Sequence, residues 1–152
     1  MAKPKIYIET TVPNYVFDQA YPERQAVAKR VFDLVKKKAI EAFISDVVLG
    51  EIDKAPAKLR AKLSKLVAGI KVLPVIKEVD SLVEKYLEEE VFPKTKRADA
   101  THVAVATVAE LDFVFSWNFR HIVRVWTKEK VEAVNKLLGY KTPKIVIPEE
   151  VI

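Results

Sequence analysis

Short apolar runs alternate with segments of helical periodicity along the whole chain, and this alternation constrains the fold more than any other feature of the sequence. The runs that predict β-strands are 5–8, 42–45, 70–76, 112–116 and 145–147. Apolar residues at helical spacing predict helices over 22–38, 46–55, 56–68, 77–91, 98–110 and 127–138. Strands that alternate with helices form a parallel sheet covered on both faces. The sequence therefore predicts an α/β protein, a three-layer sandwich around a central parallel sheet of about five strands.

The composition fits one domain spanning 1–152 and excludes several kinds of site. A chain of 152 residues, half of them hydrophobic, can bury a core without disulfides or a structural metal. It contains no cysteine, which excludes a thiol nucleophile, a disulfide framework and a cysteine-based zinc site. Its three glycines form neither a dinucleotide-binding motif nor a P-loop.

The distribution of apolar and charged residues bears on where the protein works. No stretch approaches the roughly 18 consecutive apolar residues of a membrane-spanning helix, and Glu9 interrupts the first apolar run too early for a signal peptide. We therefore expect a cytoplasmic protein without a membrane partner. Abundant charge beside three asparagines and two glutamines favours a thermophile source. The net charge of +5 permits binding to nucleic acid, although many basic proteins bind none.

Four polar residues from distant parts of the sequence are expected at one edge of the sheet. Glu9 ends the first strand, and Asn118 follows the fourth. Glu51 lies about one and a half turns into the helix after the second strand, and Asp99 lies in the first turn of the helix over 98–110. Ligands of parallel α/β sheets bind outside the carboxyl ends of the strands. These four side chains are therefore the candidate catalytic group.

Three neighbouring carboxylates allow two interpretations, of which the first is a metal site. They repel one another and raise each other's pKa, and a bound divalent cation relieves this repulsion. Oxygen ligands without cysteine or a histidine pair favour Mg²⁺ or Mn²⁺. The alternative is that Glu9 and Asp99 are ordinary residues at the ends of elements, where Asp99 would stabilise a helix N-terminus. The topology alone favours neither interpretation.

Four segments resemble the acidic motifs of the PIN domain family. Residues 6–12 are similar to the first motif, a strand that ends in an acid followed by Thr or Ser and an apolar residue. Residues 45–52 are similar to the second, a helix with an inward glutamate, and residues 97–104 to the third, an ADA-x-H-x-A helix start. Residues 115–122 match the fourth, and 147–151 resemble the end of the family. The resemblance covers nearly the whole chain in the right order.

The resemblance implies a PIN-like fold and an endoribonuclease that hydrolyses single-stranded RNA with Mg²⁺ or Mn²⁺. It implies that Glu9, Glu51 and Asp99 ligate the metal and that Asn118 stands at the fourth acidic position. Many prokaryotic members are VapC-type toxins held inactive by an antitoxin. The resemblance thus adds RNA and an antitoxin protein as expected partners.

Two positions depart from the family pattern. The first acid is usually Asp, where this chain has Glu9, and the fourth is commonly Asp, where it has Asn118. An amide oxygen can still ligate a hard ion, but the lost charge is expected to weaken metal binding. This departure keeps open a second hypothesis, a catalytically weak or inactive PIN-like module that binds RNA or acts as a scaffold. A phosphatase or phosphotransfer domain is disfavoured, since such sites use an Asp nucleophile at the end of the first strand.

Basic residues flank the candidate site in the sequence, at 94–97 and 120–124, where phosphates would require positive charge. Thr10 is placed to hydrogen-bond the scissile phosphate, and a turn hydroxyl is an equally good interpretation. A lysine stripe over 54–65 is interpreted as a solvated helix face. The residues expected to contact RNA are Thr10, Lys96, Arg97 and Arg120.

Two side chains near the candidate site have competing interpretations. His102 lies one turn after Asp99, and we favour a packed, hydrogen-bonded core residue over a general base. Trp117 is interpreted as core or dimer interface rather than as a surface for stacking bases. We also expect a homodimer whose acidic sites line one basic groove.

Overall fold

The computed structural model describes residues 2–152, and its strands form one five-stranded parallel sheet in the order β3-β2-β1-β4-β5. The predicted α/β architecture is confirmed. The strands are β1 (Lys5–Ile8), β2 (Glu41–Ser45), β3 (Lys71–Leu73), β4 (Phe113–Phe115) and β5 (Lys144–Val146).

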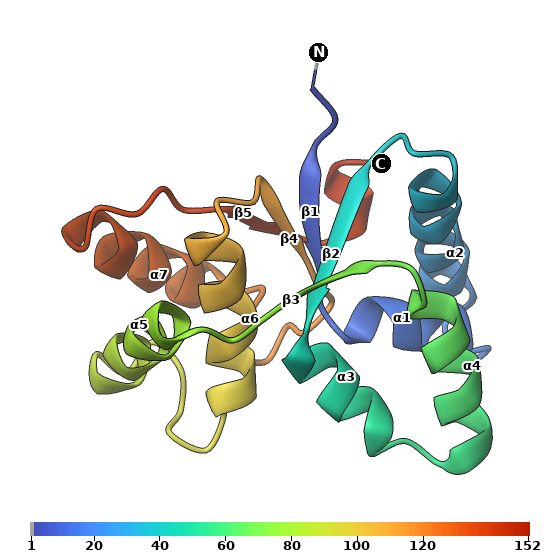
Figure 1. Cartoon of the computed structure of the whole chain (residues 1–152), viewed down its shortest axis with the longest axis horizontal. Helices are drawn as coiled ribbons and strands as arrows, with labels where there is room; N and C mark the ends of the chain where they lie inside the picture. Colours follow the sequence, from blue (N-terminus) through green and yellow to red (C-terminus); the bar gives the residue numbers. More distant parts are fainter. Residues whose placement is uncertain (1) are drawn as a thin grey trace.

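Helices cover both faces of this sheet, as Figure 1 shows. From β1 the chain moves outward to β2 and β3, then crosses to β4 and β5 on the other side of β1. Right-handed crossovers that run in opposite directions along a sheet place their helices on opposite faces. Accordingly α2 and α4 lie on one side, and α5, α6 and α7 lie on the other. The helices are α1 (Thr11–Val16), α2 (Pro22–Lys36), α3 (Asp46–Asp53), α4 (Ala57–Val67), α5 (Lys77–Glu88), α6 (Arg97–Val108) and α7 (Val125–Leu137), followed by the 3₁₀ helix η1 (Pro148–Glu150).

Burial follows position in the sheet. In the central strand β1, Ile6, Tyr7 and Ile8 are all fully buried, because helices cover both faces. The edge strand β3 exposes Lys71 and Val72 and ends before Pro74, so the predicted strand over 70–76 is too long. Pro74 has no backbone N–H for the ladder, which limits how far an edge strand extends.

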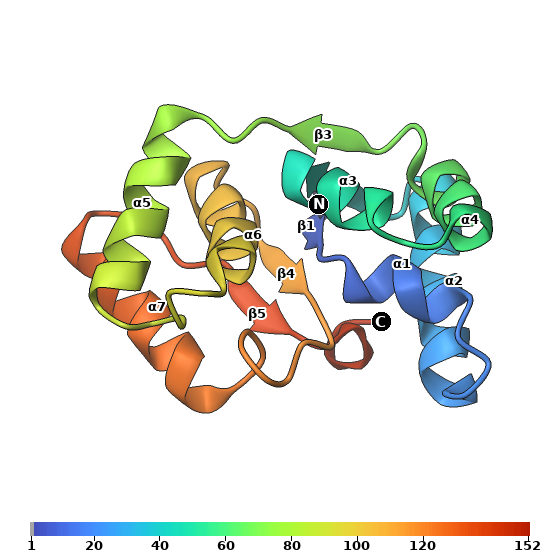
Figure 2. The ribbon, with the colours of Figure 1, turned by 90° about the horizontal axis from the view of Figure 1, so that it is seen from below.

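Helix α6 runs through the interior, as its apolar composition predicts. Every residue from Asp99 to Thr107 is buried. It packs against α5 and the sheet, and its first turns reach the carboxyl edge of the strands (Figure 2). A buried helix can therefore deliver polar side chains, here Asp99 and His102, to that edge.

The carboxyl edge of the sheet is the lower side of the molecule in Figure 1 and faces the viewer in Figure 2. The order of the strands reverses direction between β1 and β4, which makes their carboxyl ends a topological switch point.

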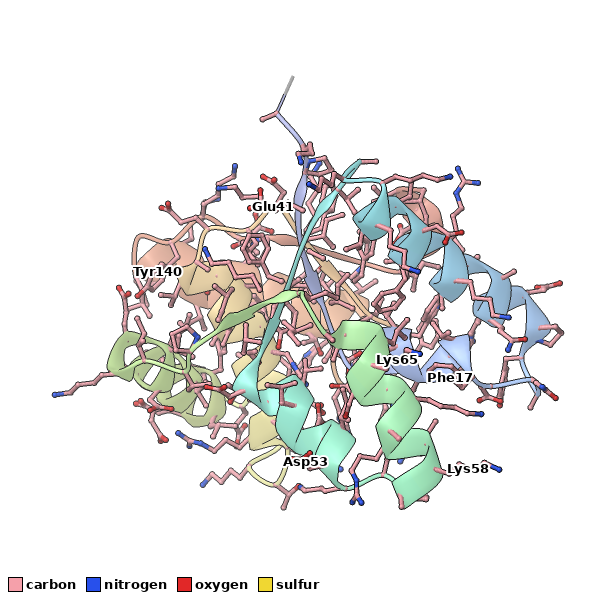
Figure 3. All side chains as sticks on the ribbon, turned by 45° about the vertical axis from the view of Figure 1, so that its right-hand side comes forward. Phe17, Glu41, Asp53, Lys58, Lys65 and Tyr140 are labelled. Atoms are coloured by element: carbon pink, nitrogen blue, oxygen red, sulfur yellow. The ribbon has the colours of Figure 1, made fainter. Side chains whose placement is uncertain are left out.

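On the outer surface, Lys58 of α4 points away from the body of the protein, as expected for a solvated helix face (Figure 3). Within residues 2–152, no helix combines the length and the apolar character needed to cross a membrane.

Candidate active site

Glu9 stands directly after β1, at the switch point of the sheet. Its backbone N–H donates to the Phe115 carbonyl oxygen at 3.1 Å, which continues the pairing of β1 with β4. The side chain is only 3% exposed, and its Oε1 accepts hydrogen bonds of 2.6 Å from the hydroxyls of Thr11 and Ser116. Burial raises the pKa of Glu9, and these bonds together with nearby His102 only partly offset that rise.

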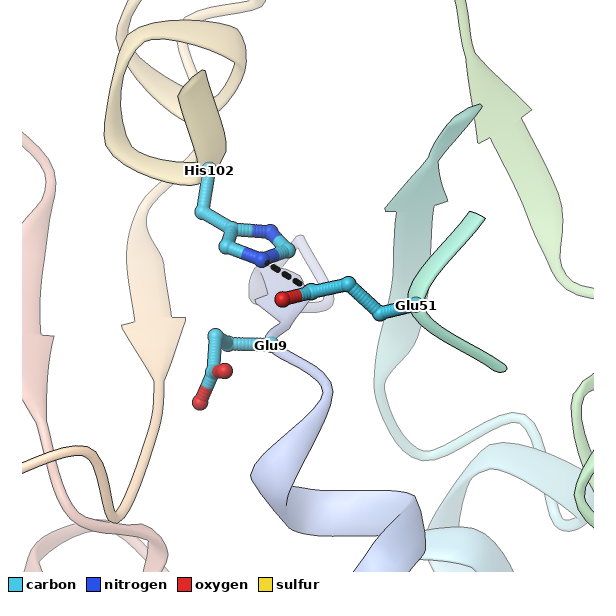
Figure 4. Close-up of side chains that lie close together, drawn as sticks. All are labelled: Glu9, Glu51 and His102. Carbon is cyan, nitrogen blue, oxygen red and sulfur yellow. Dashed lines mark hydrogen bonds and ion pairs between the residues drawn. The ribbon is translucent and has the colours of Figure 1, made fainter. Parts of the chain in front are cut away.

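Glu51 approaches the same edge from helix α3. Ser45 ends β2 and caps this helix, since its Oγ accepts the Val47 N–H at 3.2 Å. Glu51 Oε1 accepts from Thr10 Oγ1 at 2.6 Å and lies 2.7 Å from His102 Nε2 (Figure 4). Burial raises the pKa of Glu51, but the hydrogen bond and charge of His102 outweigh it and hold that pKa below its usual value.

His102 links the acidic edge to the interior. Its ring is fully buried, with Nδ1 2.6 Å from the Tyr7 hydroxyl, which in turn lies 2.7 Å from Ser45 Oγ. Burial lowers the pKa of His102, whereas the bond to Glu51 and the neighbouring carboxylates raise it, and the net shift is upward. The structure confirms a packed, hydrogen-bonded histidine. It also makes His102 a direct partner of a candidate catalytic acid.

Asp99 lies one turn before His102 on α6 and is 8% exposed. Burial raises its pKa, and the charges of His102 and His121 oppose that rise. Its Oδ1 accepts a 3.2 Å hydrogen bond from Nδ2 of Asn118. The structure thus brings Asp99 and Asn118 together, as the sequence predicts.

The amide oxygen of Asn118 has a different partner from the one expected. Asn118 Oδ1 accepts the N–H of His121 at 3.0 Å, and its own N–H donates to Ser116 Oγ at 2.9 Å. The side chain therefore orders the loop after β4 with its oxygen and holds Asp99 with its nitrogen. An amide suits this position because one group both accepts and donates.

The four residues expected to contact RNA have different surroundings. Thr10 is 7% exposed and donates to Glu51, so it positions an acid. Arg97 turns toward α5, where it pairs with Glu84 and lies 3.8 Å from Asp80. Lys96 is exposed, and its charge lowers the pKa of Asp99. Arg120 is exposed as well, with its carbonyl oxygen bonded to Arg124.

Trp117 cannot stack on a base in this structure, because it is 3% exposed and its indole N–H donates to Glu149 at 3.3 Å.

Sequence reasoning missed Thr11 and Ser116 as partners of Glu9. Ser116 could have been found from strand pairing, since Ile8 pairs with Phe115 and the next residues of both strands are Glu9 and Ser116. Thr11 carries no comparable sequence signal.

The donor set fits a hard divalent cation. Ligand atoms of Glu9, Glu51 and His102 all lie within 4.8 Å of one another, and Asp99 lies outside this close group. Both ring nitrogens of His102 already have partners, so the available ligands are oxygens. Among the described residues, Oε2 of Glu9, Oε2 of Glu51 and Oδ2 of Asp99 accept no hydrogen bond from the protein. Three free carboxylate oxygens are ligands of the kind that Mg²⁺ and Mn²⁺ prefer.

A parallel α/β sheet with acids at its switch point is the arrangement of a PIN-like fold, and solved structures confirm this fold. The chain matches a chain of the crystal structure of VapBC2 from Rickettsia felis bound to a DNA fragment from their promoter, with a TM-score of 0.59 and 11% identity over 94% of this chain and 98% of that one. It also matches Mycobacterium tuberculosis VapC20, described as a toxin that cleaves the sarcin-ricin loop, with a TM-score of 0.57 and 19% identity over 74% of this chain and 89% of that one. No protein-family model matches the sequence, and no curated protein matches it.

Proposed function

We propose that this protein is a Mg²⁺- or Mn²⁺-dependent endoribonuclease that hydrolyses phosphodiester bonds of single-stranded RNA. The observation that carries the proposal is the close approach of Glu9 and Glu51 at the switch point, with ligand atoms within 4.8 Å of each other and Asp99 nearby on α6. Each of the three acids has one carboxylate oxygen free of protein hydrogen bonds. The fold shared with VapC proteins supports it.

Some residues of the site would bind the metal ion, and others would orient those ligands. Glu9, Glu51 and Asp99 would hold the ion, whose positive charge would neutralise the acids and polarise the phosphodiester. Thr11 and Ser116 fix the orientation of Glu9. Fixing the carboxylates beforehand avoids reorganisation during the reaction.

His102 and Thr10 fix the orientation of Glu51, since both hydrogen-bond its Oε1. His102 is able to hold a proton beside Glu51, because the surrounding carboxylates raise its pKa. Lys96 is exposed next to Asp99 and is placed to attract a phosphate. Arg120 remains a proposed RNA contact, whereas the pairing of Arg97 with α5 argues against its contacting RNA.

RNA cleavage with added Mn²⁺ tests the proposal. Asp99→Ala and Glu51→Ala should each lower the cleavage rate by at least a hundredfold with an unchanged far-UV CD spectrum, since each removes an oxygen that holds the ion. The matched control is Asp53→Asn, an exposed acid two residues after Glu51 on α3, which should cleave normally. Full activity of the Asp99 and Glu51 variants would contradict the site, and inactivity that coincides with unfolding would leave it unsupported.

A second function, an RNA-binding or scaffold module without strong cleavage, is favoured by one observation. The Asn118 oxygen is occupied by the His121 N–H, so the fourth position offers the ion no free oxygen. RNA binding without cleavage at any Mn²⁺ concentration would select this function.

We further propose an antitoxin partner, a homodimer and a cytoplasmic location. The VapBC2 structure in which the matching fold occurs is a complex with promoter DNA, which supports a toxin–antitoxin context. Val125, Leu137 and Leu138 of the α7 region are exposed apolar side chains, and coverage by a second copy would remove them from water. Light scattering should give about twice the chain mass of 17.3 kDa, and a monomer at micromolar concentration would overturn the dimer.

A further inference from the structure

A cavity of about 380 Å³ lies beside the acidic site, between the α5–α6 loop and the start of α7. His121 lines it, and the His121 backbone N–H donates to Asn118, which donates to Asp99. Two hydrogen bonds thus separate the wall of the cavity from a proposed metal ligand. The volume falls in the range of small-ligand pockets.

One wall of the cavity is suited to a phosphate. Thr127 lines it and is 1% exposed. The amides of Val125, Trp126 and Thr127 begin the thirteen-residue helix α7, which has no side-chain cap and no acid in its first turn. Unpaired amides at a helix start favour anions.

Charge around this wall is mostly positive. Lys94 from the α5–α6 loop and Arg124 at the start of α7 both line the cavity and are exposed. Glu90 is the one acid among the residues that line it. A phosphate at the start of α7 would therefore meet two flexible cations and the helix amides.

A second wall is aromatic. The Trp126 ring is 45% exposed, in contrast to the buried Trp117. The Arg124 guanidinium lies 5.3 Å from its centroid and Lys130 Nζ lies 4.4 Å from it. Lys130 also reaches the Glu89 carbonyl oxygen at 3.5 Å, which ties the ring to the α5–α6 loop. Indole and guanidinium planes are both surfaces on which nucleobases stack.

We propose that this cavity binds one nucleotide of the RNA strand next to the cleaved bond, with its phosphate at the start of α7 and its base against Trp126. The inference deepens the proposed nuclease function and rests on it. Stacking on Trp126 accepts any base, so the cavity would add affinity without sequence preference. It would also fix how far the strand extends past Asp99.

Binding is measured without cleavage, in a Glu51→Gln background and without metal, using a labelled hexauridylate and the intrinsic tryptophan fluorescence. RNA should quench the fluorescence. Trp126→Ala should remove the quenching and weaken binding at least about fivefold, whereas Trp126→Phe should retain most of the affinity. Lys94→Gln should reduce the slope of log affinity against log salt by about 0.7. Lys29→Gln, an exposed lysine on α2, should leave affinity and slope almost unchanged and serves as the matched control.

The outcomes separate this inference from the nuclease itself. Cleavage by the unmodified protein with no quenching and no effect of Trp126→Ala would overturn the nucleotide site and leave the nuclease intact. Binding with quenching but without cleavage would support the nucleotide site and overturn the nuclease. Quenching by inorganic phosphate equal to that by RNA would overturn base stacking, and absence of both binding and cleavage would overturn both proposals.

Discussion

Each acid of the candidate site has one oxygen held by the protein and one left free, and this division is set by single residues. Glu9 is held by two hydroxyls, Glu51 by Thr10 and His102, and Asp99 by Asn118. Neutral donors compensate buried carboxylates only in part, which leaves the pKa values of Glu9 and Asp99 raised. A cation that binds the free oxygens would remove this remaining cost.

At the residue scale, His102→Gln tests the His102–Glu51 pair in the metal-free protein. The pKa of His102 is raised above 6.5, so its contribution to stability is full below pH 6.5 and is lost as the pH rises through the folded value. The pKa of Glu51 is lowered below 4.5, so its contribution is present above pH 4.5 and is lost as the pH falls through the folded value. The variant should therefore lose about 1–3 kcal/mol between pH 4.5 and 6.5, and less at pH 9.

Urea denaturation with EDTA at pH 5.5 and pH 9 measures this difference. Lys29→Gln, which removes an exposed positive charge on α2, is the control. A loss for His102→Gln that is the same at both pH values would mean that packing, and not the charged pair, accounts for it.

Asn118→Asp tests the fourth position. One Asp oxygen would still accept the His121 N–H, while the other would replace the amide that now donates to Asp99. The variant would lose the hydrogen bond to Asp99 and place a second carboxylate beside it. The repulsion should lower the free energy of unfolding without metal by about 1–2 kcal/mol. The added charge should tighten Mn²⁺ binding. Calorimetry with exposed Asn14→Asp as control measures both, and unchanged or weaker Mn²⁺ affinity would leave Asn118 as a loop residue only.

At the scale of elements, periodicity predicted every strand and every α-helix except α1, and it did not predict the 3₁₀ helix η1. Helix α1 has six residues with Pro13 at the third, too few for a repeating pattern. Its N-cap residue Thr10 makes no capping bond, because that hydroxyl donates to Glu51. The Thr10 hydroxyl, which would normally cap the helix, therefore bonds a residue of the candidate site instead. The sequence also did not show that His102 belongs to the site, because its partner Glu51 is 51 residues away in the chain.

Two glycines allow a matched test of local backbone preferences. Gly50 lies within α3 and Gly139 follows α7 with a φ of +83°, and an added methyl group would meet no atom within 4 Å at either position. Gly50→Ala should stabilise the protein by about 0.5–1 kcal/mol, because alanine is the better helix former. Gly139→Ala should destabilise it by about 1 kcal/mol, because an L residue is strained at positive φ. Urea midpoints that move in the same direction would contradict this account.

At the scale of the whole molecule, the strand order was the part of the fold that the sequence could not provide. Alternation indicates parallel strands but not which of them are neighbours. The order β3-β2-β1-β4-β5 places β1 beside β4, and only this adjacency brings Glu9 together with Ser116 and the loop that carries Asn118. The acids could be predicted because they follow a strand or lie in the first turns of a helix that begins at the carboxyl edge of the sheet. The hydroxyls and His102 that orient them depend on this packing.

Metal binding should therefore stabilise the fold as a whole, because its proposed ligands come from β1, α3 and α6. At a free Mn²⁺ concentration one hundred times the Kd, a site present only in the folded state adds about 2.7 kcal/mol. For a chain of this length that corresponds to a rise in Tm of about 5–10 °C. Scanning calorimetry should show this rise in the unmodified protein and in Asp53→Asn, but not in a Glu9→Gln, Glu51→Gln double variant. An equal Mn²⁺-dependent rise in all three proteins would place the ion elsewhere and remove the metal from the acidic site.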